Sequence, residues 1–195
     1  MKLSEIRNHL SKFRVGIAGA GGLGSNCAAA LARCGVGTLV ISDFDIVEEA
    51  NLNRQFYFAD QLGMDKIKAL KENIERINPE IRIIGHKTVL NKKNIPEIYK
   101  GCDIIVEAFD WADMKEMLID TIQTMMPGIP LVVGSGMAGW GNNELIKYRK
   151  IDDFLYICGD ETTEVSEEMP PMAPRVGIVS HMQANVVIDL LMKKK

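Results

Sequence analysis

The sequence predicts an α/β protein with a doubly wound, mostly parallel, Rossmann-like sheet and helices on both faces. Three observations lead to this prediction. Short apolar runs alternate with longer segments of helical periodicity along the chain. A glycine-rich turn, GAGGLG over 19–24, lies between the first apolar run and the first helical segment. The length of 195 residues suits one domain with a substantial core, so we expect residues 1–195 to form a single domain.

Each strand is predicted from a short run of β-branched and aliphatic residues. The predicted strands are 14–19, 38–42, 81–86, 103–108, 131–134, 143–149 and 154–157. Helices are predicted where no breaker interrupts an alanine-rich or amphipathic segment, over 23–34, 65–78, 112–126 and 175–192. The second of these places Ile67, Leu70, Ile74 and Ile77 at helical spacing, and Pro79 ends it.

The composition narrows the class of function. Hydrophobic residues make up 47% and charged residues 25%, as in ordinary globular proteins. A net charge of -3 gives no overall attraction to nucleic acid or to an anionic membrane, and no apolar stretch approaches a membrane span. We therefore expect a cytoplasmic protein that binds neither nucleic acid nor membrane. The four cysteines form no CxxC pair, so no zinc is expected.

The glycine-rich turn predicts a phosphate-binding cradle. Gly19, Gly21, Gly22 and Gly24 let backbone N–H groups approach a phosphate, and the following helix N-terminus adds partial positive charge. Asp43 follows the second strand, about 20 residues later, where a carboxylate can bond a ribose hydroxyl. The turn alone does not distinguish NAD, FAD, S-adenosylmethionine and ATP. A P-loop is excluded because no GK[ST] follows the glycines.

A second motif adds charges suited to a polyphosphate. The segment DFDIVEEANLNRQ over 43–55 contains Asp45, Asn51, Arg54 and Gln55, and Lys66 follows twelve residues after Arg54. Arg54 and Lys66 can neutralise phosphate charge. Asp110 comes at the end of the fourth predicted strand, and ligands bind at the carboxyl ends of strands in such sheets. A carboxylate there can hold Mg²⁺ between phosphates.

These segments together resemble a known family. The chain resembles the adenylating enzymes that activate ubiquitin-like and sulfur-carrier proteins. The resemblance rests on GAGGLG, DFDIVEEANLNRQ, Lys66 and Asp110. The similarity is greatest to the short bacterial ThiF enzymes of thiamine biosynthesis, which are related to MoeB. It extends from about Phe13 to the end of the last helix.

The resemblance implies an adenylyltransferase that uses ATP and Mg²⁺ on the C-terminal Gly-Gly carboxylate of a small β-grasp sulfur-carrier protein. Transferred by position, Gly22 contacts phosphate, Asp43 holds the ribose and Asp110 coordinates Mg²⁺. The resemblance also assigns contacts with the phosphates to Asn51, Arg54 and Lys66. The ATP-binding set is completed by Gly19, Gly21, Gly24, Asp45 and Gln55. The resemblance also implies a homodimer.

The chain departs from the family pattern, and other functions stay open. Only Cys158 lies where larger members carry zinc-binding cysteine pairs, and no cysteine occurs in the loop that some members use for sulfur transfer. Arg7 is a poor substitute for the N-terminal arginine of many members. The alternatives are activation of a carboxylate on a modified tRNA base, an NAD- or FAD-dependent oxidoreductase, and a non-catalytic subunit that docks a carrier.

Overall fold

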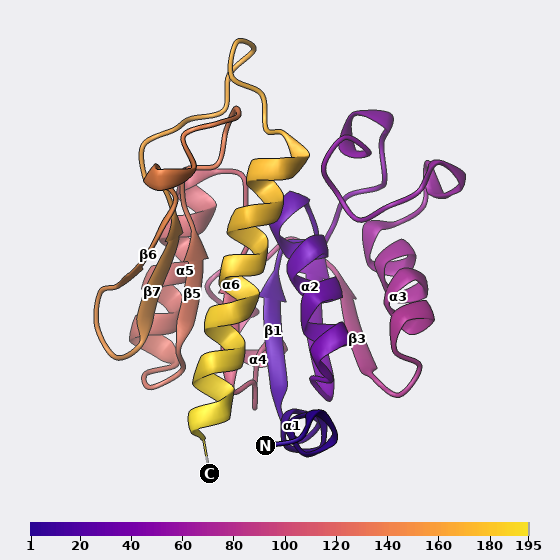
Figure 1. Ribbon diagram of the computed structural model, residues 1–195, viewed down its shortest axis with the longest axis vertical. Helices are drawn as coiled ribbons and strands as arrows, with labels where there is room; N and C mark the ends of the chain where they lie inside the picture. Colours follow the sequence, from indigo (N-terminus) through magenta and orange to yellow (C-terminus); the bar gives the residue numbers. More distant parts are fainter. Residues whose placement is uncertain (195) are drawn as a thin grey trace.

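The computed structural model, which describes residues 1–194, contains one seven-stranded sheet (Figure 1). Its strands are β1 Arg14–Ala18, β2 Thr38–Asp43, β3 Arg82–Lys87, β4 Ile104–Glu107, β5 Leu131–Gly134, β6 Lys147–Lys150 and β7 Leu155–Gly159. The strand order is β3-β2-β1-β4-β5-β7-β6, and only β6 runs antiparallel to its neighbour. The predicted fold class is confirmed.

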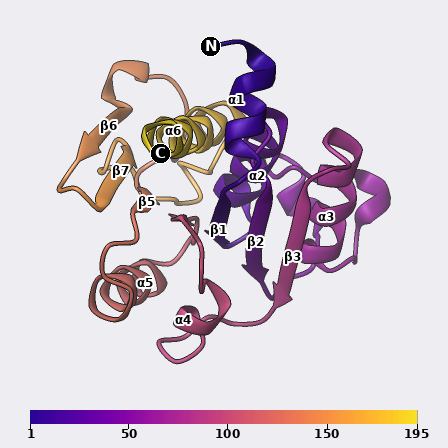
Figure 2. The same ribbon diagram turned by 90° about the horizontal axis from the view of Figure 1, so that it is seen from below.

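Helices cover both faces of the sheet (Figures 1 and 2). They are α1 Leu3–Leu10, α2 Gly22–Cys34, α3 Lys66–Ile77, α4 Ile95–Ile98, α5 Ala112–Met125 and α6 Ala173–Lys193. The larger apolar core joins α2, α3 and α6 to one face, and a second core joins α4 and α5 to the other. Burial on both faces explains why the central strands are almost entirely apolar.

Three differences from the predicted elements have local physical causes. The strand predicted over 143–149 begins only at Lys147, because Asn142 adopts a left-handed backbone (φ 48°) and Asn143–Leu145 form a 3-10 turn. The last helix begins at Ala173, with Pro174 in its first turn, where proline's missing N–H costs no hydrogen bond. Helices α1 and α4 were not predicted: α1 buries only Leu10, and α4 is a single turn.

The chain reverses direction across the sheet between β1 and β4. From β1 the chain passes to β2 and β3 on one side, and then returns to β4 on the other side. Such a switch point opens a crevice at the carboxyl ends of the strands. The segments after β1, β2, β3 and β4 line it, at the end of the molecule opposite to both termini (Figure 1). Among residues 1–194, no helix is long and apolar enough to span a bilayer.

Candidate active site

A cavity of about 320 Å³ lies in this crevice. Predicted site residues that line it are Gly19, Gly21, Asp43, Asp45, Lys66 and Asp110. They come from the turn after β1, the loop after β2, the start of α3 and the turn after β4. The fold therefore brings together residues from four separate segments, and the volume is in the range of small-molecule sites.

The glycine-rich turn is shaped by two glycines that tolerate no side chain. Gly19 has φ 101°, and its N–H donates to the Ser42 carbonyl at 2.9 Å. A Cβ on Gly24 would lie 1.9 Å from the Gly19 carbonyl oxygen, so α2 can begin this close to β1 only with glycine here. A Cβ on Gly21 would meet nothing closer than 3.8 Å. No side chain at Gly21 separates the start of α2 from the cavity, so an anion bound there could meet the first backbone N–H groups of this helix.

Asp43 fixes the turn as well as lining the cavity. Its Oδ2 accepts a hydrogen bond from the Ala20 N–H at 2.7 Å, and its Oδ1 accepts one from the Asp45 N–H at 2.8 Å. Each carboxylate oxygen keeps a further lone pair. The side chain can therefore hold the glycine turn in place and still accept a hydrogen bond from a ligand hydroxyl.

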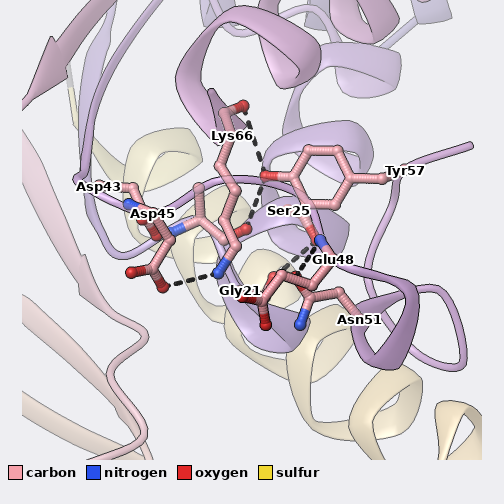
Figure 3. A network of polar contacts seen from close by, with 9 residues as sticks. Gly21, Ser25, Asp43, Asp45, Glu48, Asn51, Tyr57 and Lys66 are labelled. Atoms are coloured by element: carbon pink, nitrogen blue, oxygen red, sulfur yellow. Dashed lines mark hydrogen bonds and ion pairs between the residues drawn. The ribbon is translucent and has the colours of Figure 1, made fainter. Parts of the chain in front are cut away.

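Lys66 and Asp45 form an ion pair at the cavity wall (Figure 3). The distance from Lys66 Nζ to Asp45 Oδ2 is 2.8 Å, and the Lys66 side chain is only 7% exposed, whereas Asp45 is 45% exposed. Tyr57 supports this wall, since its hydroxyl donates to the Ala20 carbonyl at 2.7 Å. Burial raises the pKa of Tyr57, and Asp43 and Asp45 raise it further, so the phenol stays a neutral donor.

The other predicted polar residues do not line the cavity. Gln55 is buried, its Oε1 has no partner, and its Nε2 is 3.8 Å from where a Cβ on Gly21 would lie. The Arg54 stem passes over Gly22, while its Nη1 donates to the Ala50 carbonyl and to Asn53 Oδ1. Asn51 Oδ1 accepts the Glu48 N–H. In this arrangement Arg54 and Asn51 are engaged within their own loop, and Gln55 has an unused acceptor next to the glycine turn.

Asp110 lines the cavity close to the glycine turn and next to an apolar rim. Asp110 is exposed, and its Oδ2 lies 4.0 Å from where a Cβ on Gly21 would be. Phe44, Val89 and Trp111 line the cavity although they are 53%, 52% and 71% exposed. Exposed apolar side chains at a cavity mouth favour a planar ligand group that would cover them.

Sequence reasoning missed two buried ion pairs near this site. Glu107 pairs with Lys115 at 2.9 Å, and Asp160 pairs with Arg175. The Arg175 Nη1 also donates to the Gly141 carbonyl at 2.6 Å, so this pair ties the glycine-rich segment 134–141 to the start of α6. The one available signal was the single acid at the end of the apolar run DIIVEA, because a charge beside a buried strand needs a partner.

The structure does not offer a protein-only metal cage within residues 1–194, since no three His, Cys, Asp or Glu side chains there are grouped to hold a metal ion. Mg²⁺ needs no such cage, because it usually binds one or two carboxylates together with substrate phosphates. Cys158 is fully buried, and burial raises the pKa of its thiol to about 12, so it is not a reactive thiolate at pH 7.

Comparison with known families gives the decisive observation. The sequence pattern of the ThiF family matches residues 4–195. The chain belongs to the ThiF family. The resemblance noted from the glycine turn and the DFDIVEEANLNRQ segment is therefore confirmed at the family level.

This ThiF-family chain has relatives in eukaryotes and archaea. It is 31% identical over 194 residues to the adenylyltransferase and sulfurtransferase MOCS3 of Caenorhabditis briggsae, an alignment covering 96% of this chain and 48% of that protein. It is 35% identical over 132 residues to the SAMP-activating enzyme E1 of Haloferax volcanii, covering 67% of this chain and 48% of the relative. The chain thus spans about half the length of these relatives.

Solved structures share the fold of this ThiF-family chain. Escherichia coli tRNA N6-threonylcarbamoyladenosine dehydratase, TcdA, in complex with ATP superimposes with a TM-score of 0.86 at 22% identity, covering 96% of this chain and 89% of that one. Escherichia coli MccB with ATP gives a TM-score of 0.72 at 23% identity, covering 96% and 58%. At these identities the likeness establishes the fold.

Proposed function

We propose that the chain is an adenylyltransferase that uses Mg²⁺ and ATP to activate the C-terminal Gly-Gly carboxylate of a small β-grasp sulfur-carrier protein. The observation that carries this proposal is the cavity at the β1–β4 switch point, which joins a helix N-terminus, Asp43, Lys66 and Asp110. The names of its relatives, adenylyltransferases and an activating enzyme, support the same reaction class. A carrier of the thiamine type is our first candidate substrate.

The residues present fit ATP. The turn around Gly21 is open toward Gln55 and Asp110, so a phosphate placed there would reach backbone N–H groups, and the unused Gln55 Oε1 can accept a hydrogen bond from a ligand hydroxyl. Asp43 has lone pairs for ribose hydroxyls, and the apolar rim suits a nucleobase. Asp110, alone or with Asp45, would hold Mg²⁺, which when bound would neutralise phosphate charge.

The ion pair of Lys66 and Asp45 suggests how the phosphates are received. Lys66 is almost buried, so its charge is costly unless it is paired. Asp45 supplies that pairing now, and a polyphosphate would compete for the same ammonium group. We infer that the Lys66 ammonium group contacts phosphate oxygens when the nucleotide binds, either in place of Asp45 or in addition to it. Arg54 would then release the Ala50 carbonyl and turn toward the same phosphate charge.

The chemistry needs positioning more than covalent help. An oxygen of the carrier carboxylate, already ionised at pH 7, attacks the α-phosphorus of ATP. A new O–P bond forms, the bond from the α-phosphorus to the oxygen bridging to the β-phosphorus breaks, and that oxygen leaves with pyrophosphate. No general base is required, and the site has no histidine along its cavity. Arg54 and Lys66 would stabilise charge that develops on the leaving group.

The test is exchange of radiolabelled pyrophosphate into ATP in the presence of Mg²⁺ and a panel of carrier proteins ending in Gly-Gly. We expect exchange only with a carrier, strong loss in Arg54→Ala, and nearly intact exchange in Cys158→Ser. A carrier lacking its last glycine should fail, since the carboxylate would lie about 3.3–3.6 Å from its place.

The other outcomes separate the alternatives. Exchange without a carrier would indicate a small-molecule carboxylate, and exchange only with modified tRNA would indicate activation of a tRNA base. No exchange with any substrate, together with tight NAD binding, would contradict adenylation and favour an oxidoreductase. ATP binding without exchange, together with tight carrier binding, would indicate a docking subunit.

A further inference from the structure

Glu107 and Lys115 form a buried charge pair behind the wall that carries Asp110. Glu107 is the last residue of β4, and its side chain is fully buried, while that of Lys115 on α5 is 20% exposed. The Lys115 Nζ lies 2.9 Å from each Glu107 carboxylate oxygen and 2.8 Å from the Gly134 carbonyl oxygen. All three donor positions of the ammonium group are thus used.

The pair connects the Asp110 turn to the end of β5. Glu107 Oε1 also accepts the Phe109 N–H at 2.6 Å, which fixes the turn one residue before Asp110. Gly134 is the last residue of β5 and the first of the glycine-rich segment 134–141. From the other side of the sheet, Gln183 Nε2 donates to the Glu107 carbonyl at 2.8 Å. One ammonium group therefore holds the Asp110 turn and the start of the glycine-rich segment in a fixed relation.

A buried charge pair is poorly suited to packing alone, because removing both charges from water costs free energy. Burial raises the pKa of Glu107, and although Lys115 and the Phe109 N–H act against this, the net shift remains upward. Replacing buried ion pairs by apolar residues of similar size is often neutral or stabilising in proteins. Stability alone therefore does not account for the pair, whereas one of the two segments that it joins, the turn of Phe109 and Asp110, lines the cavity.

We propose that Glu107 and Lys115 are positioning residues of the adenylation site, which hold the Asp110 turn against the end of β5 so that Asp110 meets the bound nucleotide in a fixed position. This inference rests on the proposed function. Neither residue touches the reacting atoms; both act through Asp110 and the backbone. Misplacement of a reacting group by about 1 Å commonly costs on the order of 100-fold in rate.

Two variants distinguish a role of the pair in positioning the site from a role in stabilising the fold. Lys115→Met leaves the Glu107 carboxylate buried without its partner, so we expect a lower unfolding temperature and a lower kcat. The apolar double variant Glu107→Leu/Lys115→Met removes both charges and the acceptor of the Phe109 N–H. It should regain most of the unfolding temperature, yet keep a kcat for pyrophosphate exchange about 10- to 100-fold below that of the wild type. The Kd for ATP should stay within about threefold, because the glycine turn and Asp43 are untouched. Rates are expressed per folded protein.

The control is Asp120→Asn on the same helix. It breaks the exposed Lys92–Asp120 pair, which lies away from the cavity, and should change neither kcat nor ATP binding. If the double variant regains both stability and kcat, the pair is only structural and the proposal is wrong. It is also wrong if ATP binding weakens by the same factor as the rate.

A second measurement is independent of catalysis. Hydrogen–deuterium exchange of the Phe109 N–H should be at least about tenfold faster in the double variant and unchanged in Asp120→Asn. Unchanged protection in the double variant would overturn the positioning role. If wild type lacks pyrophosphate exchange while this protection falls as expected, the proposed function fails but the clamp on the Asp110 turn stands.

Discussion

Asp43 and Asp110 are both carboxylates at strand ends, but their surroundings give them different tasks. Asp43 accepts backbone N–H groups from Ala20 and Asp45 and so belongs to the framework of the glycine turn. Asp110 is exposed and lines the cavity beside that turn, with its Oδ2 4.0 Å from where a Cβ on Gly21 would be. A change at Asp43 should therefore disturb nucleotide binding, whereas a change at Asp110 should leave the framework intact.

Asp110→Asn provides the test at this scale. We expect pyrophosphate exchange to fall by about 10²–10³, since the loss of one charge-stabilising group commonly costs that much. ATP should still bind within about threefold of wild type, as measured by calorimetry. The matched control is Asp113→Asn, an exposed carboxylate three residues further on that does not line the cavity. Turnover near wild type in Asp110→Asn would contradict the assignment of Mg²⁺ to this residue.

At the scale of elements, the contact of α2 with β1 depends on one missing side chain. Gly24 lies against the Gly19 backbone, whereas a Cβ on Gly177 in α6 would meet no atom within 4 Å. Gly24→Ala should destabilise the protein by roughly 3 kcal/mol or more, because backbone must move to relieve the clash. Gly177→Ala should stabilise it by about 0.5–1 kcal/mol through helix propensity. Urea unfolding at pH 7 measures both, and similar effects in the two variants would contradict the packing argument.

A second feature at the scale of elements is the buried ion pair of Asp160 and Arg175, which holds the segment before α6 in place. Burial acts to raise the pKa of Asp160, but hydrogen bonds from Thr163 and Thr162 and the charge of Arg175 outweigh it and lower the pKa. A carboxyl group whose folded-state pKa is lowered adds stability above its unfolded pKa of about 3.9. That stability is lost as the pH falls through the lower, folded-state pKa.

Asp160→Asn should therefore cost about 3 kcal/mol at pH 7, because it leaves the buried Arg175 unpaired. The difference in unfolding free energy between wild type and variant should shrink as the pH is lowered from about 5 toward 3, by equilibrium denaturation in urea. Exposed Glu161→Gln, which breaks the pair with Arg149, serves as control and should change stability by no more than about 1 kcal/mol. A pH-independent difference at Asp160 would show that its charge is not the cause.

For the whole molecule, we predict a homodimer, as the family resemblance implies. Large apolar side chains remain exposed at the β6–β7 side and on α6, among them Tyr148, Phe154 and Ile178, and a second subunit could bury such residues. Sedimentation equilibrium at micromolar concentration should give twice the chain mass of 21.7 kDa. A single species at the chain mass over that range would contradict the prediction.

The sequence was sufficient for the fold class because its signals are local. Apolar runs, helical spacing and the glycine turn each depend on residues close together in the chain. The predicted elements match β1 to β5, β7 and the long helices to within two residues at each end. Elements with little apolar content, α1 and the start of β6, gave no such signal, so their limits depend on which neighbours they meet.

Part of the candidate site could likewise be predicted from local sequence signals, and part could not. Gly19, Asp43, Lys66 and Asp110 could be identified from the sequence because each stands at a strand end or helix start, and parallel strands bring those positions to one edge. The pairing of Lys66 with Asp45, of Glu107 with Lys115 and of Asp160 with Arg175 was decided only by the tertiary structure. Burial fixes such pairs, because a charge removed from water must find a partner across the fold, and sequence spacing does not specify which one.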